Sequence, residues 1–276
     1  MPELAEVEYY RKRWNCGIGA RVVAVKLHAD KRVFRGMPVR ALKTQLTGSV
    51  MSGSAAHGKQ ILFNFSPGAW LGVHLGMTGE LAVGPPNLTP DKHDHLVLYQ
   101  EQRSLIFRDP RQFGRVRFGV GQSPPDWWAG LPPAVTSAEF RPIVMMEFLK
   151  RHRKLPVKAA LLLQAGFPGI GNWMADEVLW RSKIHPSTPV GLLAESQITD
   201  LWRNLRFVCR HALRHVGADF SDPPAGWLFH ERWQQQGRCP IHKGVLERHT
   251  IGGRTTRWCA ICQSGNKSSA APREPR

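Results

Sequence analysis

The chain has 276 residues, of which 42% are hydrophobic and 21% charged, a composition typical of a folded protein with room for about two domains. Lys and Arg outnumber Asp and Glu 38 to 21, giving a net charge of +17, so a polyanionic partner is expected, with nucleic acid ahead of a membrane surface. No run approaches the ~18 apolar residues of a membrane span, no signal peptide is evident, and the five cysteines do not form a secreted disulfide pattern, which favours a reducing cytoplasm.

The first expected element is a short helix over residues 4–14, where Leu4, Val7 and Trp14 recur at helical spacing. Pro2 and Glu3 precede it, and both suit the start of a helix. If the initiator methionine is trimmed, Pro2 also presents a free secondary amine, which titrates near pH ~8 and is partly nucleophilic at neutral pH. Position alone therefore leaves a structural and a chemical role open for Pro2.

From about residue 20 to 120 the chain consists of short β-rich runs separated by Gly, Pro and polar clusters, which predicts an antiparallel β-sandwich or barrel. The fourth and fifth runs are joined by a predicted hairpin turn. Prolines concentrate in residues 121–140, which indicates a linker between two domains. The predicted strands are 21–28, 60–65, 70–76, 95–100, 104–109 and 114–119.

Beyond the linker the pattern becomes helical, and a helical domain is expected over 141–217. The clearest helix, 196–216, carries an apolar stripe and an opposite basic face, for which solvation and phosphate contact are both open. That face consists of Arg203, Arg206, Arg210 and Arg214. The other predicted helices are 143–151, 156–165 and 172–182. A loop region at 218–237, a Cys/His segment at 238–263 and a disordered tail at 264–276 complete the expected organisation.

The Cys/His segment has the spacing of a metal site. Cys239 and His242 form one pair, Cys259 and Cys262 a second, and sixteen residues separate the inner ligands. Two such pairs predict one structural zinc ion, because two hairpin knuckles close a tetrahedron and four protein ligands leave no open coordination position.

Between the two pairs, Gly252 and Gly253 are flanked by β-formers, which predicts a β-hairpin. It would carry Arg254 and Arg257, and arginines on a metal-stapled hairpin suit contact with phosphates or a nucleic-acid groove. The remaining cysteines, Cys16 and Cys209, lie in apolar patterns and are expected to be buried.

Six further stretches have ordinary local explanations, such as turn glycines, a hairpin arginine and a helix N-cap. They are PELAEVE at 2–8, GK at 58–59, HLGMTG at 74–79, KHDH at 92–95, DPRQFG at 109–114 and PGIGNWMADEVL at 168–179. Together with the Cys/His segment they resemble, in order and over nearly the whole chain, the formamidopyrimidine-DNA glycosylase and endonuclease VIII family. The N-terminal PEL is closer to the formamidopyrimidine branch, whose members are bifunctional DNA glycosylases and AP lyases.

The resemblance implies an α+β fold of two domains, with an N-terminal antiparallel β-sandwich and helix over 1–120, then a helix-two-turn-helix region and a zinc-finger hairpin. Pro2 matches the nucleophile that attacks the sugar C1′ and forms a Schiff base. Glu3 matches the carboxylate that handles protons at the deoxyribose, and Glu6 a second, supporting carboxylate. Lys59 matches a lysine that contacts phosphate and assists elimination, and Arg254 a finger arginine that contacts DNA and helps the second elimination.

The implied partner is damaged double-stranded DNA, bound by a monomer. A base must leave the stack before its glycosidic bond is attacked, and Met, Phe and Arg suit the gap that it leaves. The family's gap-filling residues match Met77, Arg111 and Phe113. The residues that match contacts to the DNA backbone are His93, Lys154 and Asn172.

The chain departs from the family pattern at three places. Ala5 stands where proline is usual, inside the first helical turn, and His242 replaces a usual cysteine ligand, which should make zinc binding more sensitive to mild acid. Residues 217–239 are shorter than the family's segment containing the loop that closes over extruded 8-oxoguanine. The shortening counts against an 8-oxoguanine preference and favours ring-opened purines, hydantoins or oxidised pyrimidines.

Two interpretations remain from the sequence. One is a base-excision-repair enzyme that acts through its N-terminal proline, in the cytoplasm or at a bacterial nucleoid. The other is a non-catalytic or weakly catalytic protein on the same scaffold, which binds DNA lesions or has a structural role on nucleic acid. Pro2, Glu3 and Lys59 favour the enzyme, because a pure binder has no use for a free N-terminal proline.

Overall fold

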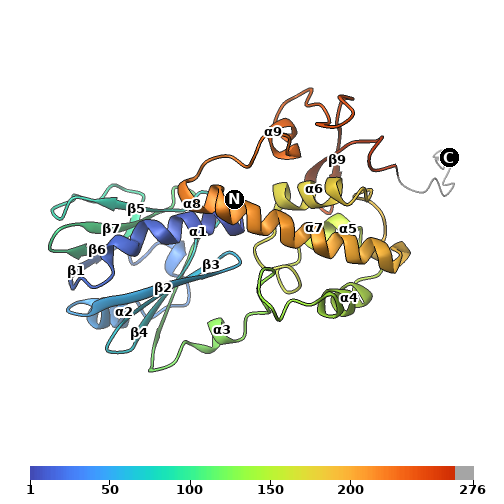
Figure 1. Ribbon diagram of the computed structural model, residues 1–276. Coiled ribbons are helices and arrows are strands. Elements are labelled where there is room, and N and C mark those ends of the chain that lie inside the picture. The colour runs from blue at the N-terminus through green and yellow to red at the C-terminus, as the bar shows by residue number, and fades with distance from the viewer. Residues whose placement is uncertain (265–276) are drawn as a thin grey trace, which may run out of the picture. The chain divides into compact units, whose positions relative to one another are not determined.

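The computed structural model describes residues 1–264, which fall into two compact units (Figure 1). Unit 1 comprises Met1–Glu139, Phe167–Gly171 and Cys209–Asp222, and unit 2 comprises Phe140–Gly166, Asn172–Val208 and the chain from Pro223 onward. Two short segments from the second half of the sequence therefore belong to the N-terminal unit. The tail predicted at 264–276 lies, except for its first residue, outside the described residues.

Unit 1 contains two four-stranded antiparallel sheets whose inward side chains share one apolar core. The first sheet has the order β1 (Val22–Leu27), β6 (Asp94–Gln100), β7 (Ser104–Arg108) and β5 (Glu80–Gly84). The second has the order β2 (Val50–His57), β3 (Gln60–Ser66), β4 (Ala69–His74) and β8 (Arg115–Val120). The β-sandwich and all six predicted strands are confirmed. Strands β2 and β5 were not predicted, because VMSGSAAH and ELAVG contain few β-formers.

Helices close this unit. Helix α1 (Leu4–Arg13) buries Leu4, Ala5 and Val7, so the alanine that replaces the family's proline lies inside the first helical turn, as expected. Helix α8 (Val216–Asp219) contacts α1, where the Lys12 ammonium donates a 2.8 Å hydrogen bond to the Gly217 carbonyl. The remaining helical segments of unit 1 are η1 (Trp14–Gly17), η2 (Arg32–Phe34), α2 (Val39–Leu46) and α3 (Asp126–Ala129).

Helix α3 lies in the proline-rich stretch 121–140 and packs onto the second sheet. A side-chain carbon at Gly72 would lie 2.4 Å from the Trp127 ring, and one at Gly119 would lie 2.8 Å from Pro125. These two strand glycines therefore let the stretch lie flat against β4 and β8.

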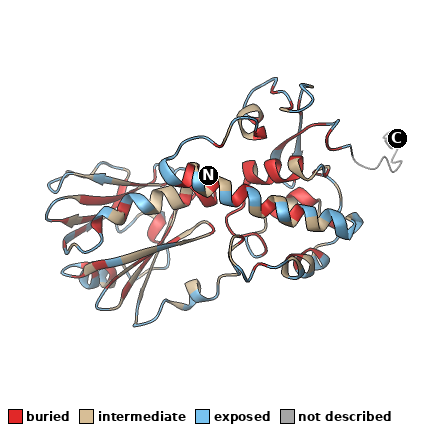
Figure 2. Ribbon diagram, viewed as in Figure 1, coloured by how far each residue is buried: buried red, intermediate tan, exposed pale blue. Residues whose placement is uncertain are grey.

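Unit 2 is helical and ends in a β-hairpin. It contains α4 (Pro142–Arg151), α5 (Val157–Leu161), α6 (Asn172–Arg181), η3 (Val190–Leu192), α7 (Glu195–Arg214, whose last turns belong to unit 1), α9 (Leu228–Arg232) and the hairpin of β9 (Glu247–Ile251) and β10 (Arg254–Trp258). The predicted helices are confirmed, although α5 ends at Leu161 rather than at residue 165. Eight of the ten residues of α6 are buried, which makes it the central helix of the unit (Figure 2). Among the described residues, no helix is both long and apolar enough to cross a membrane.

Candidate active site

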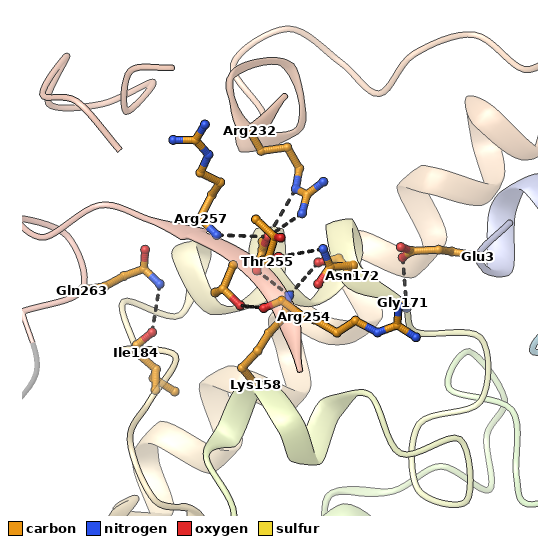
Figure 3. Close-up of polar contacts among 12 residues, drawn as sticks. Glu3, Lys158, Gly171, Asn172, Ile184, Arg232, Arg254, Thr255, Arg257 and Gln263 are labelled. Atoms are coloured by element: carbon orange, nitrogen blue, oxygen red, sulfur yellow. Dashed lines mark hydrogen bonds and ion pairs between the residues drawn. The ribbon is translucent and has the colours of Figure 1, made fainter. Parts of the chain in front are cut away.

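The N-terminus of α1 holds two carboxylates in different ways. The Glu6 carboxylate accepts a 3.1 Å hydrogen bond from the Glu3 backbone N–H and completes a capping box. The Glu3 side chain is only 4% exposed, and its carboxylate accepts a 3.0 Å hydrogen bond from the Gly171 N–H (Figure 3). The helix cap explains Glu6 and one contact of Glu3, whose side chain accepts from the Glu6 N–H in the same capping box. The burial of Glu3 and its hydrogen bond to a distant loop exceed what a helix start requires.

The loop Phe167–Gly171 approaches the N-terminus closely because three glycines lack side chains. The Leu4 N–H donates to the Gly169 carbonyl at 2.9 Å. A side-chain carbon on Gly171 would lie 2.2 Å from Cδ of Glu3, and one on Gly58 would lie 2.9 Å from the Gly169 nitrogen. The loop thus contacts both the start of α1 and the β2–β3 turn, which places Glu3 and the turn residue Lys59 in one region of unit 1.

Lys59 lies beside the first residues of the chain. Its ammonium is 4.0 Å from the sulfur of Met1, whose side chain is 48% exposed. The Pro2 nitrogen is in a peptide bond with Met1, so removal of this exposed residue would leave a secondary amine close to Lys59 and Glu3. The structure therefore brings Pro2, Glu3, Glu6 and Lys59 together.

Asp109 joins the two turns that carry the predicted gap-filling residues. Its carboxylate accepts 2.9 Å and 2.7 Å hydrogen bonds from the Thr78 hydroxyl and the Gly114 N–H. The turns touch, because a side-chain carbon on Gly76 would lie 2.5 Å from the Gly114 nitrogen. Sequence reasoning gave this buried aspartate no role, although it opens the DPRQFG motif.

The predicted gap-filling residues themselves lie at the surface of these turns. The Arg111 guanidinium lies 4.8 Å from the centre of the Phe113 ring, and Phe113 is 41% exposed. Met77 is half-buried on the neighbouring turn. His93 is half-buried and is connected to these turns through its backbone, because its carbonyl accepts a 3.1 Å hydrogen bond from the Asp109 N–H.

His74, at the end of β4, lies near Lys59 of the candidate site and was not predicted from the sequence. Burial, followed by the positive charges of Lys59, Arg117 and Arg35, lowers the pKa of His74 to about 4. The ring is therefore neutral at physiological pH, and its Nδ1 accepts a 3.1 Å hydrogen bond from the Gly76 N–H. Its position at the start of HLGMTG was the available signal.

In unit 2, Asn172 begins α6 and forms hydrogen bonds through both its backbone carbonyl and its side chain. Its backbone carbonyl accepts a 2.7 Å hydrogen bond from the Lys158 ammonium, and its side-chain NH₂ donates to the Thr255 carbonyl at 2.8 Å (Figure 3). Lys158 is fully buried and also forms an ion pair with Asp176. Lys154, four residues earlier, is exposed in the turn after α4.

Asp176 connects the helices to the hairpin. Its second carboxylate oxygen accepts a 2.7 Å hydrogen bond from the Arg232 guanidinium and a 3.3 Å bond from the Arg257 N–H. The side chain of Arg257 is buried and donates to the Gln234 carbonyl at 2.7 Å, so its predicted availability for nucleic-acid contact is wrong. Arg254 is exposed directly after the Gly252-Gly253 turn, where both glycines have positive φ.

The ligand atoms of Cys239, His242, Cys259 and Cys262 lie within 4.8 Å of one another and form a potential metal-binding site. The Cys239 and Cys262 sulfurs are 3.6 Å apart, close to the edge of about 3.8 Å in a tetrahedron with zinc–sulfur bonds of about 2.3 Å. Backbone N–H groups of His242 and Cys262 each donate to the sulfur three residues earlier at 3.5 Å. This N–H donation is the local geometry of a metal knuckle, so the residues fit a structural ion.

One thiol of this site, that of Cys239, ionises more readily than a free cysteine. Burial opposes ionisation of Cys239, but donation to its sulfur from the His242 N–H and the Trp180 indole outweighs burial and lowers the pKa of Cys239 to about 6. Of the cysteines outside the cluster, Cys209 is buried as predicted, whereas Cys16 is exposed. The prediction for Cys16 is wrong because the 3₁₀ turn that follows α1 points it outward.

The chain matches the model of the formamidopyrimidine-DNA glycosylase N-terminal domain over residues 1–116 and that of the formamidopyrimidine-DNA glycosylase H2TH domain over residues 131–222. It belongs to the formamidopyrimidine-DNA glycosylase family. Two family members called formamidopyrimidine-DNA glycosylase, from Roseiflexus sp. (strain RS-1) and Thermus thermophilus, are each 34% identical to it over 95% of this chain and 100% and 98% of theirs.

Solved structures of the same family are also similar. Wild-type Lactococcus lactis Fpg (MutM) in complex with DNA containing N7-benzyl-Fapy-dG has a TM-score of 0.85 and 26% identity, over 95% of this chain and 99% of that one. MutM in complex with DNA containing carbocyclic 8-oxo-G has a TM-score of 0.85 and 27% identity, over the same shares. The family resemblance and the α+β two-domain fold expected from the sequence are confirmed.

Proposed function

We propose that this protein is a base-excision-repair DNA glycosylase with AP lyase activity, which removes oxidised bases from double-stranded DNA. The observation that carries the proposal is the packing of Gly171 against Glu3, because it holds a buried carboxylate beside Pro2 and Lys59. Family membership and the net charge of +17 support the same substrate class.

The chemistry follows from the N-terminal amine. After Met1 is removed, the lone pair of the Pro2 nitrogen attacks C1′, and the damaged base leaves with the electrons of the glycosidic bond and takes up a proton from solvent. The nitrogen then loses its single proton, and its lone pair breaks the C1′–O4′ bond while O4′ accepts a proton from Glu3. The product is a cationic Schiff base, which acidifies the adjacent sugar hydrogen. Removal of that hydrogen expels the 3′ phosphate, and a second elimination releases the sugar. Glu3 transfers protons at the deoxyribose, Glu6 supports the helix start, and Lys59 binds phosphate and assists elimination.

The proposed DNA contacts are those that the family resemblance implies. Met77, Arg111 and Phe113 fill the gap left by the extruded base, as side chains on two joined surface turns can do. Contacts to the backbone come from His93, Lys154, Asn172 and Arg254, the last also helping the second elimination. One zinc ion held by Cys239, His242, Cys259 and Cys262 fixes the hairpin that carries Arg254.

The segment between α8 and α9 bears on the substrate. On one side Phe220 packs on Tyr9 with ring centres 4.7 Å apart, and on the other His230 is hydrogen-bonded to the Pro223 carbonyl at 2.8 Å. Few residues remain between these anchors to close over an extruded base. We therefore infer that ring-opened purines, hydantoins or oxidised pyrimidines are preferred to 8-oxoguanine.

On this proposal, residues 1–120 form the catalytic domain and 121–140 a linker. Residues 141–217 form the helix-two-turn-helix domain, 218–237 the shortened capping region and 238–263 the zinc finger. The protein acts as a monomer on DNA in the cytoplasm.

Borohydride trapping tests the proposal. The mature protein, shown by intact mass to lack Met1, is mixed with duplex DNA containing an abasic site and reduced. A covalent adduct is expected, and Pro2→Gly or an acylated N-terminus should remove most of it. No adduct from protein that lacks Met1 would defeat the lyase proposal. Tight lesion binding without strand cleavage would favour the alternative, a lesion-binding protein on the same scaffold.

A further inference from the structure

The outer face of the second sheet carries a row of cations that begins at the candidate active site. His74 pairs with Gln60 of β3 on one side and with Arg115 of β8 on the other. Lys59 immediately precedes Gln60, so Lys59, His74 and Arg115 lie at the same end of three adjacent strands. Two residues along β8, Arg117 pairs with Gly72.

Strand geometry places the two arginines of β8 on one face. Side chains alternate along a strand, and Val116 between them is 1% exposed in the apolar core. Arg115 and Arg117 therefore project from the opposite, outer face, about 7 Å apart along the strand. They extend the positive charge of Lys59 away from the candidate active site.

Within the described part of the chain, the three arginines of this cluster are not paired with an acid, although the charge of Asp109 acts on the neighbouring His74. Among the described residues, Arg35, Arg115 and Arg117 form no ion pair, and Nε of Arg115 is buried without a hydrogen-bond partner. Arg35 donates to the Gly114 carbonyl at 2.9 Å, which anchors it beside the start of β8. Burial and then the charge of Arg115 lower the pKa of both Arg35 and Arg117. The repulsion would be relieved by an anion.

Arg117 is also held in one orientation. Its guanidinium lies 5.4 Å from the centre of the Trp127 ring, and Trp127 occupies the space that a side chain at Gly72 would fill. An arginine stacked on an aromatic ring keeps its in-plane N–H groups available, and these match a phosphate bidentately. The α3 segment therefore serves to orient this cation.

We propose that Arg115 and Arg117, with Arg35 beside them, bind backbone phosphates of the DNA and lengthen the track that begins at Lys59. The site is a phosphate-binding surface that reads no base sequence, so it acts equally on damaged and intact duplex. The inference rests on the proposed function, since it takes DNA as the ligand.

The test measures the salt dependence of binding to an undamaged duplex by fluorescence anisotropy. Arg117→Met keeps an apolar stem over Trp127 and removes the charge, Arg117→Lys keeps the charge, and Arg40→Met removes an exposed charge on α2 as the matched control. Each lost phosphate contact should reduce the slope of log K against log salt by about 0.9. The affinity deficit of Arg117→Met should therefore shrink about 3.5-fold between 50 and 200 mM salt.

We expect Arg117→Met to reduce the slope by about 0.9 and Arg115→Met/Arg117→Met to reduce it by about twice as much. Arg117→Lys and Arg40→Met should keep the slope of the unaltered protein. Thermal melting of each variant verifies that α3 stays packed. A full slope in a folded Arg117→Met protein overturns the inference while leaving the proposed function intact. If the unaltered protein does not bind DNA, both the inference and the proposed function are overturned. If it binds DNA normally but gives no borohydride-trapped adduct, only the proposed chemistry is contradicted.

Discussion

The Gly171 N–H donates a 3.0 Å hydrogen bond to the Glu3 carboxylate across 168 residues of sequence. The contact depends on glycine, because a side-chain carbon at position 171 would lie 2.2 Å from Cδ of Glu3. The candidate active site is thus completed by a loop from the second half of the chain that belongs to the N-terminal unit. Glu3 is therefore held both by the capping box of its own helix and by this distant loop.

Gly171→Ala should therefore displace the Glu3 carboxylate. If Glu3 transfers protons during base excision, single-turnover excision should fall by at least about a hundredfold. Gly244→Ala is the matched control, because its added carbon would meet only Ile261 at an ordinary 3.6 Å. Unchanged excision by a folded Gly171→Ala protein would contradict the role assigned to Glu3.

A second prediction concerns Asp109, which joins the turns that carry Met77 and Phe113. Asp109→Ala leaves the Thr78 hydroxyl and the Gly114 N–H without their acceptor and should lower the free energy of unfolding by about 1–3 kcal/mol. Affinity for an abasic duplex should fall more than affinity for an intact one, because Met77 and Phe113, the proposed gap-filling residues, lose their fixed position. Asp30→Ala, at an exposed position, should change neither quantity. Equal losses on both duplexes would disconnect Asp109 from gap filling.

Local signals predicted much of this fold. The six β-runs, the long helix and the Cys/His spacing are each encoded in short stretches, and all were found in the structure. Strand β2 was missed because Gly, Ser and Ala dominate it and its partner β3 supplies the pairing. The roles proposed for Pro2 and Lys59 came from the family resemblance, because a proline and a turn lysine carry no such signal by themselves.

Contacts between distant segments had no sequence signal. Lys158 and Asp176 look like surface charges within helical patterns, yet both are fully buried and paired. Arg254 and Arg257 lie three residues apart, so strand alternation puts them on opposite faces of the hairpin, but only the packing of the hairpin against α6 decides which face is buried. The packing of Phe167–Gly171 in unit 1 was equally unpredictable, because a Gly-rich turn carries no signal for the segment that it contacts.

The buried network predicts an asymmetry between two substitutions. Asp176→Asn leaves Lys158 and Arg232 buried without a counter-charge and should destabilise the protein by about 3–5 kcal/mol. Lys158→Met should cost less, because Asp176 keeps Arg232 and the Arg257 N–H. Denaturant unfolding measures both. Arg203→Met, which breaks an exposed ion pair with Asp200, should cost no more than about 1 kcal/mol. A larger loss for Lys158→Met than for Asp176→Asn would reverse the proposed order.

His74 predicts a pH dependence of stability. Its folded pKa is about 4 against an ordinary 6.5, so between these values the unfolded chain binds a proton that the folded chain does not. Its contribution is present above 6.5 and is lost as the pH falls toward 4, by at most about 1.4 kcal/mol per pH unit. His74→Asn keeps an acceptor for the Gly76 N–H and does not titrate. The variant should therefore lose less stability on acidification, as parallel unfolding titrations would measure; identical slopes would place His74 outside this linkage.

Removal of the metal should loosen the finger hairpin. Purified protein is expected to carry one zinc ion by native mass spectrometry, and a chelator should remove it. Without the ion, three buried cysteines and His242 no longer fix the two knuckles, so Arg254 loses its position and DNA affinity should fall. Tryptophan emission should change as well, because the Trp180 indole donates to the Cys239 sulfur at 3.4 Å.

Adding zinc back should restore both emission and binding. Cys259→Ser should reproduce the chelated state, whereas Cys16→Ser removes an exposed thiol outside the cluster and should keep its metal and its affinity. Because Asn172 and Asp176 also hold β10 from α6, the helical part of unit 2 should stay folded after chelation. DNA affinity that survives complete loss of zinc would show that these hydrogen bonds alone position the hairpin, and the ion would then have no part in binding.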